Sequence, residues 1–88
     1  MIFGHLVPGE IYKIPKGSSS LTLWDKKFEN KIVECPSGSI LTFVSFTKVS
    51  DKGQYVDTCW IAGRYCGFID IFHGSARANE IKNYIKLT

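Results

Sequence analysis

The sequence lacks the features by which most enzymes and membrane proteins are recognised. Its 88 residues contain no apolar run near the roughly 20 residues that span a bilayer. There is no glycine-rich phosphate loop. The two histidines, His5 and His73, fall in no Ser-His-Asp or Cys-His pattern, and Asp70 has no second acid or base near it in sequence. We therefore expect a protein that is not an enzyme and needs no cofactor.

Cysteine and charge are also sparse. The three cysteines are an odd number that cannot all pair within one chain, which favours a reducing compartment and burial of the thiols. The spacing of Cys59, Cys66 and His73 does not match the short ligand pairs of zinc sites, so no metal is expected. The first residues lack the charged and apolar regions of a signal peptide. With a net charge of only +3, we predict a cytoplasmic protein without membrane contact.

What the sequence does contain is a regular alternation of turns and short apolar strands. It is 44 % hydrophobic, and Gly, Pro, Ser and Asp recur about every ten residues. This pattern is typical of a small all-β barrel or sandwich, and the length indicates one domain, residues 1–88. The strands are predicted at residues 10–14, 21–24, 31–35, 39–46, 54–61, 64–72 and 84–87.

The segment before the last strand has a different composition. Residues 76–81 are mostly good helix formers, and Ser75 can cap the first turn. We predict a short helix followed by a strand. Because Ile81 and Ile85 are four residues apart, a longer amphipathic helix that runs through Tyr84 is the alternative.

Residues 39–46 do not alternate as a half-buried strand should. Ile40, Val44 and Phe46 fall on one face, whereas Leu41 and Phe43 fall on the other. This pattern predicts a strand covered on both faces, with the N-terminal segment over the side that does not face the core.

The register of the hairpin after residue 54 can be predicted from its turn. A type II′ turn needs glycine first and places it at Gly63-Arg64, whereas a type I′ turn at Ala62-Gly63 would force a positive φ on Ala62. The first register sets Cys59 opposite Phe68, diagonal to Cys66. The second would set the two cysteines directly opposite each other. We predict the first, without a disulfide.

Four segments resemble the SH3 family. Residues 21–25 (LTLWD) resemble the opening motif of an SH3 domain, and residues 37–44 resemble its glycine and following strand. Residues 67–69 (GFI) and 83–87 (NYIKL) resemble the late strand and the closing segment. The resemblance covers about residues 20–88. It implies an SH3-like barrel, here with an N-terminal strand added and one short helical turn.

An SH3-like fold implies binding of a protein or peptide through surface aromatics. The resemblance places Trp24 and Tyr84 on aromatic positions of the SH3 ligand groove. It places either Tyr55 or Trp60 on the position of the tryptophan that begins the third strand of that groove. With Phe28, these five residues form the expected binding site. No proline precedes residues 83–84 and residues 25–31 are not acidic, so a proline-rich ligand is not implied.

Three alternatives stay open. The barrel could bind single-stranded nucleic acid, stacking bases on Tyr12, Tyr55 or Trp60 and using lysines as anion contacts. It could be a viral or mobile-element accessory protein that inhibits a host protein. An exposed edge strand or aromatic patch could also support a homo-oligomer. The lysines weighed as anion contacts are Lys26, Lys27 and Lys31, together with Lys13 and Lys16.

Overall fold

The computed structural model describes residues 3–87 as a curled antiparallel sheet with one short helix. Strands make up 47 % of the described residues and helix 8 %, which confirms the predicted all-β class. Within the described residues, the helix is seven residues long and no helix could cross a membrane. The elements are β1 (Ile11–Lys13), β2 (Leu21–Trp24), β3 (Lys31–Cys35), β4 (Ile40–Val49), β5 (Tyr55–Ala62), β6 (Tyr65–Phe72), α1 (Ala76–Lys82) and β7 (Ile85–Lys86).

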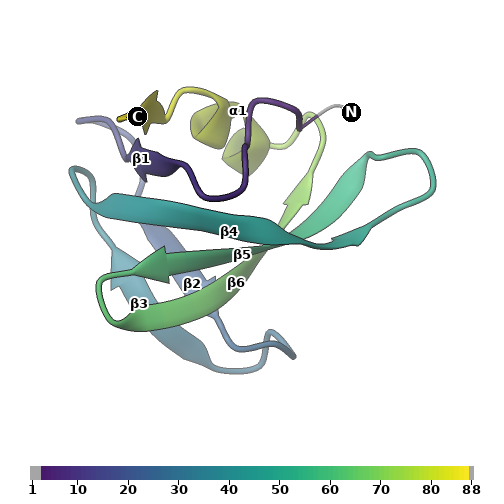
Figure 1. Ribbon diagram of the computed structural model, residues 1–88, viewed down its shortest axis with the longest axis horizontal. Coiled ribbons are helices and arrows are strands. Elements are labelled where there is room, and N and C mark those ends of the chain that lie inside the picture. The colour runs from purple at the N-terminus through teal and green to yellow at the C-terminus, as the bar shows by residue number, and fades with distance from the viewer. Residues whose placement is uncertain (1–2, 88) are drawn as a thin grey trace.

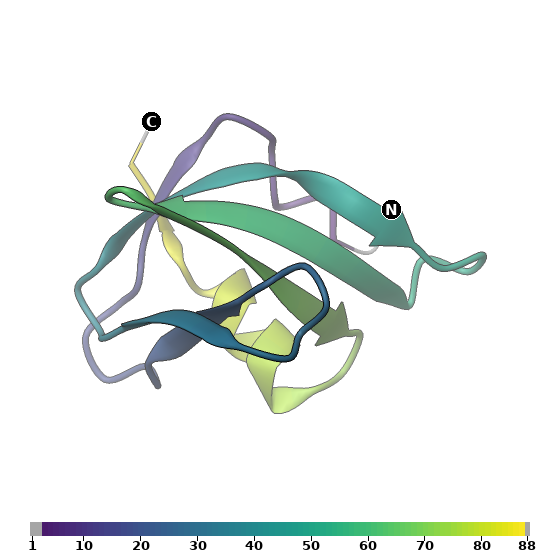
Figure 2. The same cartoon turned by 90° about the horizontal axis from the view of Figure 1, so that it is seen from below.

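The seven strands form a single sheet in the order β3-β2-β6-β5-β4-β1-β7. All pairs are antiparallel, and the long strands β4, β5 and β6 form a meander at its centre. In Figure 1 the N-terminal segment and α1 lie together at one end of the curled sheet. Figure 2 shows β6 and β5 running between the β2–β3 hairpin and β4. The sheet therefore wraps around one interior.

The predicted secondary structure is confirmed with small shifts at the ends of elements. β2 and β3 have the predicted bounds, and β4 runs three residues further than predicted. Ser75 is the N-cap of α1, because its hydroxyl accepts a hydrogen bond from the Ala78 amide at 3.1 Å. The longer helix through Tyr84 does not form. α1 ends at Lys82, and β7 follows as an edge strand paired with β1.

The irregular pattern of β4 is explained by two β-bulges, and the prediction that both of its faces are covered is wrong. The register with β5 shifts between Phe43 and Ser45, and again between Phe46 and Lys48. Each shift adds one residue to β4, so Phe46 turns to the side of Phe43. The two rings pack with centroids 5.0 Å apart, while Ile40 is 57 % exposed. Phe3 and Leu6 of the N-terminal segment join this same core.

The β5–β6 hairpin has the predicted register. Ile61 pairs with Cys66 and Cys59 pairs with Phe68 across the two strands. The turn begins at Gly63, whose φ of +62° is the left-handed value that a type II′ turn requires at its first central position. Glycine adopts this value without steric cost, so the turn fixes the register.

The core is centred on Trp60, which has no exposed surface. Its ring contacts Tyr12 of β1, Phe43 of β4 and Tyr84 before β7, with centroids 5.0–6.4 Å apart. The indole N–H donates to the Thr58 hydroxyl at 2.8 Å, and that hydroxyl donates to the Ile69 carbonyl at 2.9 Å. Both polar side chains are thereby satisfied without water, as burial requires.

The N-terminal segment closes one side of this core. Phe3 and Leu6 are 2–3 % exposed and belong to the same cluster as Trp60. Tyr12 holds the segment in place, because its hydroxyl accepts from the Val7 amide and donates to the His5 carbonyl, each at 3.0 Å. The segment is therefore part of the folded unit.

Replacing Thr58 by Val should lower the free energy of unfolding by about 1–3 kcal/mol, because the buried Trp60 N–H then has no acceptor. Urea unfolding followed by tryptophan fluorescence measures the change. Thr47→Val, at an exposed position of β4, is the control and should change the unfolding free energy little. Equal effects of the two substitutions would contradict the role assigned to the Thr58 hydroxyl.

Candidate binding face

The outward side of the sheet is defined by alternation along β5 and β6. Val56, Thr58 and Trp60 of β5 are fully buried. Gly67, Ile69 and Ile71 of β6 are also buried and line the same interior. Successive strand residues point to opposite faces, so the residues between these point outward. On β5 they are Tyr55, Asp57, Cys59 and Ile61, and on β6 they are Cys66, Phe68, Asp70 and Phe72.

These outward residues form direct cross-strand pairs. Tyr55 lies opposite Phe72 with ring centroids 4.6 Å apart, and Asp57 lies opposite Asp70. Cys59 lies opposite Phe68, whose other neighbour across the sheet is Trp24 of β2. Two aromatic pairs thus flank a pair of carboxylates. We call this surface the aromatic–acidic face: Trp24, Tyr55, Asp57, Phe68, Asp70 and Phe72.

Gly67 allows β2 to approach β6 closely enough to place Trp24 on this face. A Cβ atom at Gly67 would lie 2.5 Å from the Leu23 Cβ and 3.1 Å from the Trp24 carbonyl oxygen. Real side chains do not tolerate such distances, so only glycine permits this crossing. The glycine of the 67–69 motif therefore has a packing role.

The two aspartates give the face a negative centre. Like charges directly opposite each other on a sheet are unfavourable. The Oδ1 atom of Asp57 is buried and has no hydrogen-bond partner in the described part of the chain. A hydrogen bond with Asp57, partial burial, and the charges of Asp57 and Asp70 together raise the pKa of Tyr55 to about 12. The face therefore concentrates two carboxylates between its two aromatic pairs.

Of the five predicted binding residues, the structure brings Trp24 and Tyr55 to this face and places two others elsewhere. Trp60 is wholly buried, and including it in a surface site was wrong because the core of the barrel needs its ring. Tyr84 is 8 % exposed and packs against Trp60 on the interior side. Burial raises the pKa of Tyr84 to about 12. A partner cannot reach either ring in this conformation.

Phe28 lies in the β2–β3 turn, and the predicted anion contacts Lys26, Lys27 and Lys31 lie in or beside it. Phe28 is half-buried with a φ of +57°, which is strained for a bulky residue. The Asp25 carboxylate holds the turn by accepting from the Glu29 amide at 2.9 Å and the Asn30 side chain at 2.8 Å. These bonds lower the pKa of Asp25. The turn carries carboxylates among its cations, so it is not a purely basic surface.

Lys26, Lys27 and Lys31 are all exposed, and acidic residues lie close to each of them. Lys26 and Lys27 share the turn with Asp25 and Glu29. Lys31 forms an ion pair with Glu34 at 3.5 Å. No strong positive patch results.

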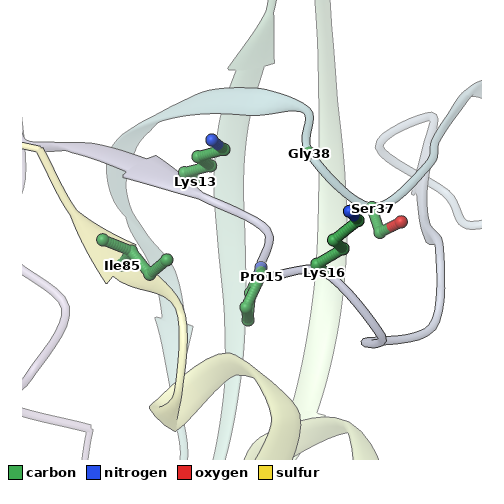
Figure 3. Close-up of a pocket in the computed structure, with 6 residues that line it drawn as sticks. All are labelled: Lys13, Pro15, Lys16, Ser37, Gly38 and Ile85. Carbon is green, nitrogen blue, oxygen red and sulfur yellow. The ribbon is translucent and has the colours of Figure 1, made fainter.

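A hollow of about 470 Å³ lies near the edge of the sheet where β7 pairs with β1 (Figure 3). No carboxylate is among its lining residues, and the loop after β1 is held to α1 by a hydrogen bond of 2.8 Å from the Ser19 amide to Glu80. It therefore offers two ammonium groups and a hydroxyl beside apolar side chains. The lining residues are Lys13, Pro15, Lys16, Ser37, Gly38 and Ile85.

Two kinds of residue in the aromatic–acidic face were not predicted as binding residues. Phe68 and Phe72 are near neighbours of Trp24 and Tyr55 only because the strands pair as they do. Asp70 points outward on β6, and its direct partner Asp57 was not named among the candidate residues. Alternation along β5 and β6 was the available signal. Within residues 3–87, no group of three or more His, Cys, Asp and Glu residues could hold a metal ion.

Comparison with known proteins adds no relative: no family model, curated sequence or solved structure matches this chain.

The raised pKa of Tyr55 can be tested by absorbance titration of the phenolate. Below pH 10 the phenol is neutral in both states, and as pH rises from about 10 to about 12 the unfolded chain ionises first, so stability is lost over this range. The difference between wild type and Tyr55→Phe should show one phenol that titrates near pH 12. The same difference in an Asp57→Asn background should move toward pH 10. An unchanged curve would show that Asp57 does not interact with Tyr55.

Proposed function

We propose that this protein is a non-catalytic, SH3-like interaction module that binds a protein or peptide through the aromatic–acidic face, and that the partner presents an Arg or Lys side chain. The carboxylate pair flanked by aromatic pairs carries the proposal. Aromatic side chains supply large contact area at low entropic cost and are frequent in binding hot spots.

The charges of the face argue for a basic group on the partner. An incoming guanidinium or ammonium group would relieve the repulsion between Asp57 and Asp70. Asp70 is exposed, so its carboxylate is open to a charge-assisted hydrogen bond from such a group. Phe72 is 56 % exposed beside these carboxylates, so its ring can lie against the same cation. Each element of the face thus favours a positively charged ligand.

A second copy of the same face is a poorer partner. Two identical faces brought together would set Asp57 and Asp70 against the same carboxylates of the other chain. The charge repulsion would then increase. We therefore propose a different protein as the partner, with the homo-oligomer as the less favoured outcome.

The SH3-like family stays part of the proposal, with a different binding surface. Support comes from the curled antiparallel sheet and from Gly67, whose motif packs against β2. The groove implied by the resemblance is not carried over, because Trp24 points outward beside Phe68 while Tyr84 packs inward against Trp60. The ligand is therefore placed on the open sheet.

Truncation of the face should weaken capture of the partner. We expect Phe72→Ala and Trp24→Ala each to reduce binding by about 1–3 kcal/mol, the usual range for an aromatic anchor. Asp70→Asn should also weaken binding, because one carboxylate loses its charge. Immobilised protein is incubated with lysate of the cells that encode it, and retained proteins are quantified by mass spectrometry. Affinities are then measured with the identified protein.

The control is Leu87→Ala, which removes a similarly exposed apolar side chain near β7. It should retain the partner at the wild-type level. Circular dichroism establishes that each variant is folded. If folded Phe72→Ala, Trp24→Ala and Asp70→Asn all retained the same proteins as wild type, the proposed face would be wrong.

Nucleic-acid binding is the second candidate, and the lysine-lined hollow is what favours it. Against it, Tyr12 and Trp60 are buried and cannot stack with bases, which leaves Tyr55. Phosphate contacts weaken steeply with salt. Nuclease treatment and a salt series separate the two functions: retention that is lost with nuclease, and reduced by Lys13→Ala and Lys16→Ala, would replace the protein-binding proposal.

A further inference from the structure

Two cysteines on neighbouring strands bring their sulfur atoms into contact. Cys59 of β5 and Cys66 of β6 are diagonal neighbours, because Cys59 pairs with Phe68 and Cys66 pairs with Ile61. Their Sγ atoms are nevertheless 3.5 Å apart. A disulfide bond is about 2.0 Å long, so the sulfurs would need to move together by only about 1.5 Å. The diagonal register therefore does not prevent a bond between them.

The two thiols differ in their access to solvent. Cys66 is exposed, whereas Cys59 is 8 % exposed, and burial with the neighbouring Cys66 raises the pKa of the Cys59 thiol to about 11. An exposed thiol is the one that a reagent in solution meets first. The third cysteine, Cys35, is 3 % exposed in the core. The pair thus consists of one thiol that solvent reaches and one largely buried thiol in contact with it.

We propose that Cys59 and Cys66 are a reversible oxidation site, which closes to an intrachain disulfide by exchange with a small-molecule disulfide such as oxidised glutathione. Both thiols are free in the structure, and their contact distance and unequal exposure fix the order of events. Nothing in this step depends on the binding face.

The chemistry proceeds in two exchanges. The Cys66 thiolate attacks one sulfur of glutathione disulfide, the S–S bond breaks, and one glutathione thiolate leaves. Cys59 then loses its proton to water, and its thiolate attacks the Cys66 sulfur and displaces the second glutathione. Two protein thiols are oxidised, and one glutathione disulfide is reduced to two glutathione molecules. The same steps in reverse restore the thiols.

The fold can accommodate the bond because both residues lie on one hairpin. Right-handed twist of a two-stranded ribbon brings one of its two diagonals closer than the other. The two cysteines lie across one such diagonal with their Sγ atoms 3.5 Å apart, and the turn at Gly63 lies between them. The bond would therefore join two strands that are already paired.

The test uses the fully reduced wild-type protein and oxidised glutathione at pH about 8, where thiol–disulfide exchange proceeds. After acid quenching, intact mass should show the loss of two hydrogen atoms and no retained glutathione. Peptide mapping should link residue 59 to residue 66, and dithiothreitol should reverse the change.

Three variants assign the roles. Cys59→Ser should accumulate one glutathione on Cys66, because the second exchange has lost its nucleophile. Cys66→Ser should stay unmodified, and Cys35→Ser should behave as wild type. Circular dichroism checks that each variant is folded, and the wild-type peptide map stands if one is not.

Three results would overturn the proposal. The first is a glutathione adduct that persists on the wild-type protein. The second is a disulfide between two chains in place of the link within one chain. The third is a folded Cys66→Ser variant that reacts as fast as wild type.

Discussion

The burial of Trp60 is the interaction on which the other parts of this structure depend. Its ring contacts aromatic side chains from β1, β4 and the segment before β7, so one side chain joins elements from both ends of the chain. Such a large ring can be buried only if its N–H has an acceptor. Thr58, two residues earlier on the same strand, supplies that acceptor. Its hydroxyl in turn donates a hydrogen bond to the Ile69 carbonyl of β6. The packing of the core around Trp60 therefore depends on the hydrogen bonds of its buried polar groups.

The same interaction determines what the protein shows to solvent. Once Thr58 and Trp60 point inward, the residues between and beside them must point outward, because a strand alternates with a period of two. The direct pairing of β5 with β6 then sets Tyr55 against Phe72 and Asp57 against Asp70. A one-residue slip of β5 would turn Asp57 toward the core and Trp60 toward solvent. The aromatic–acidic face is thus a consequence of the core, although neither of its carboxylates contributes to it.

The diagonal cysteine pair follows from this register too. Cys59 is between the two inward residues Thr58 and Trp60, and the turn at Gly63 places Cys66 within contact of it. Register alone suggested that the two residues were too far apart for a bond. In the folded hairpin the two sulfur atoms are nevertheless 3.5 Å apart. The geometry of the hairpin therefore brings two thiols into contact, which the strand pattern alone did not predict.

The sequence alone determined the local elements. Glycines mark the turns, Ser75 caps the helix, and the steric freedom of Gly63 decides the hairpin register, because each of these depends on neighbouring residues only. The all-β class could be predicted for the same reason.

Tertiary structure decided which aromatic residues are available for binding. An aromatic ring suits a core and a surface equally well by its chemistry, so Trp24 and Trp60 could not be told apart until the sheet closed around one of them. The two bulges of β4 could not be predicted from the sequence either. A residue is extra in a strand only relative to the strand with which it pairs. The pairing of Trp24 with Phe68 exists only because β2 lies beside β6, which brings together residues that are distant along the chain.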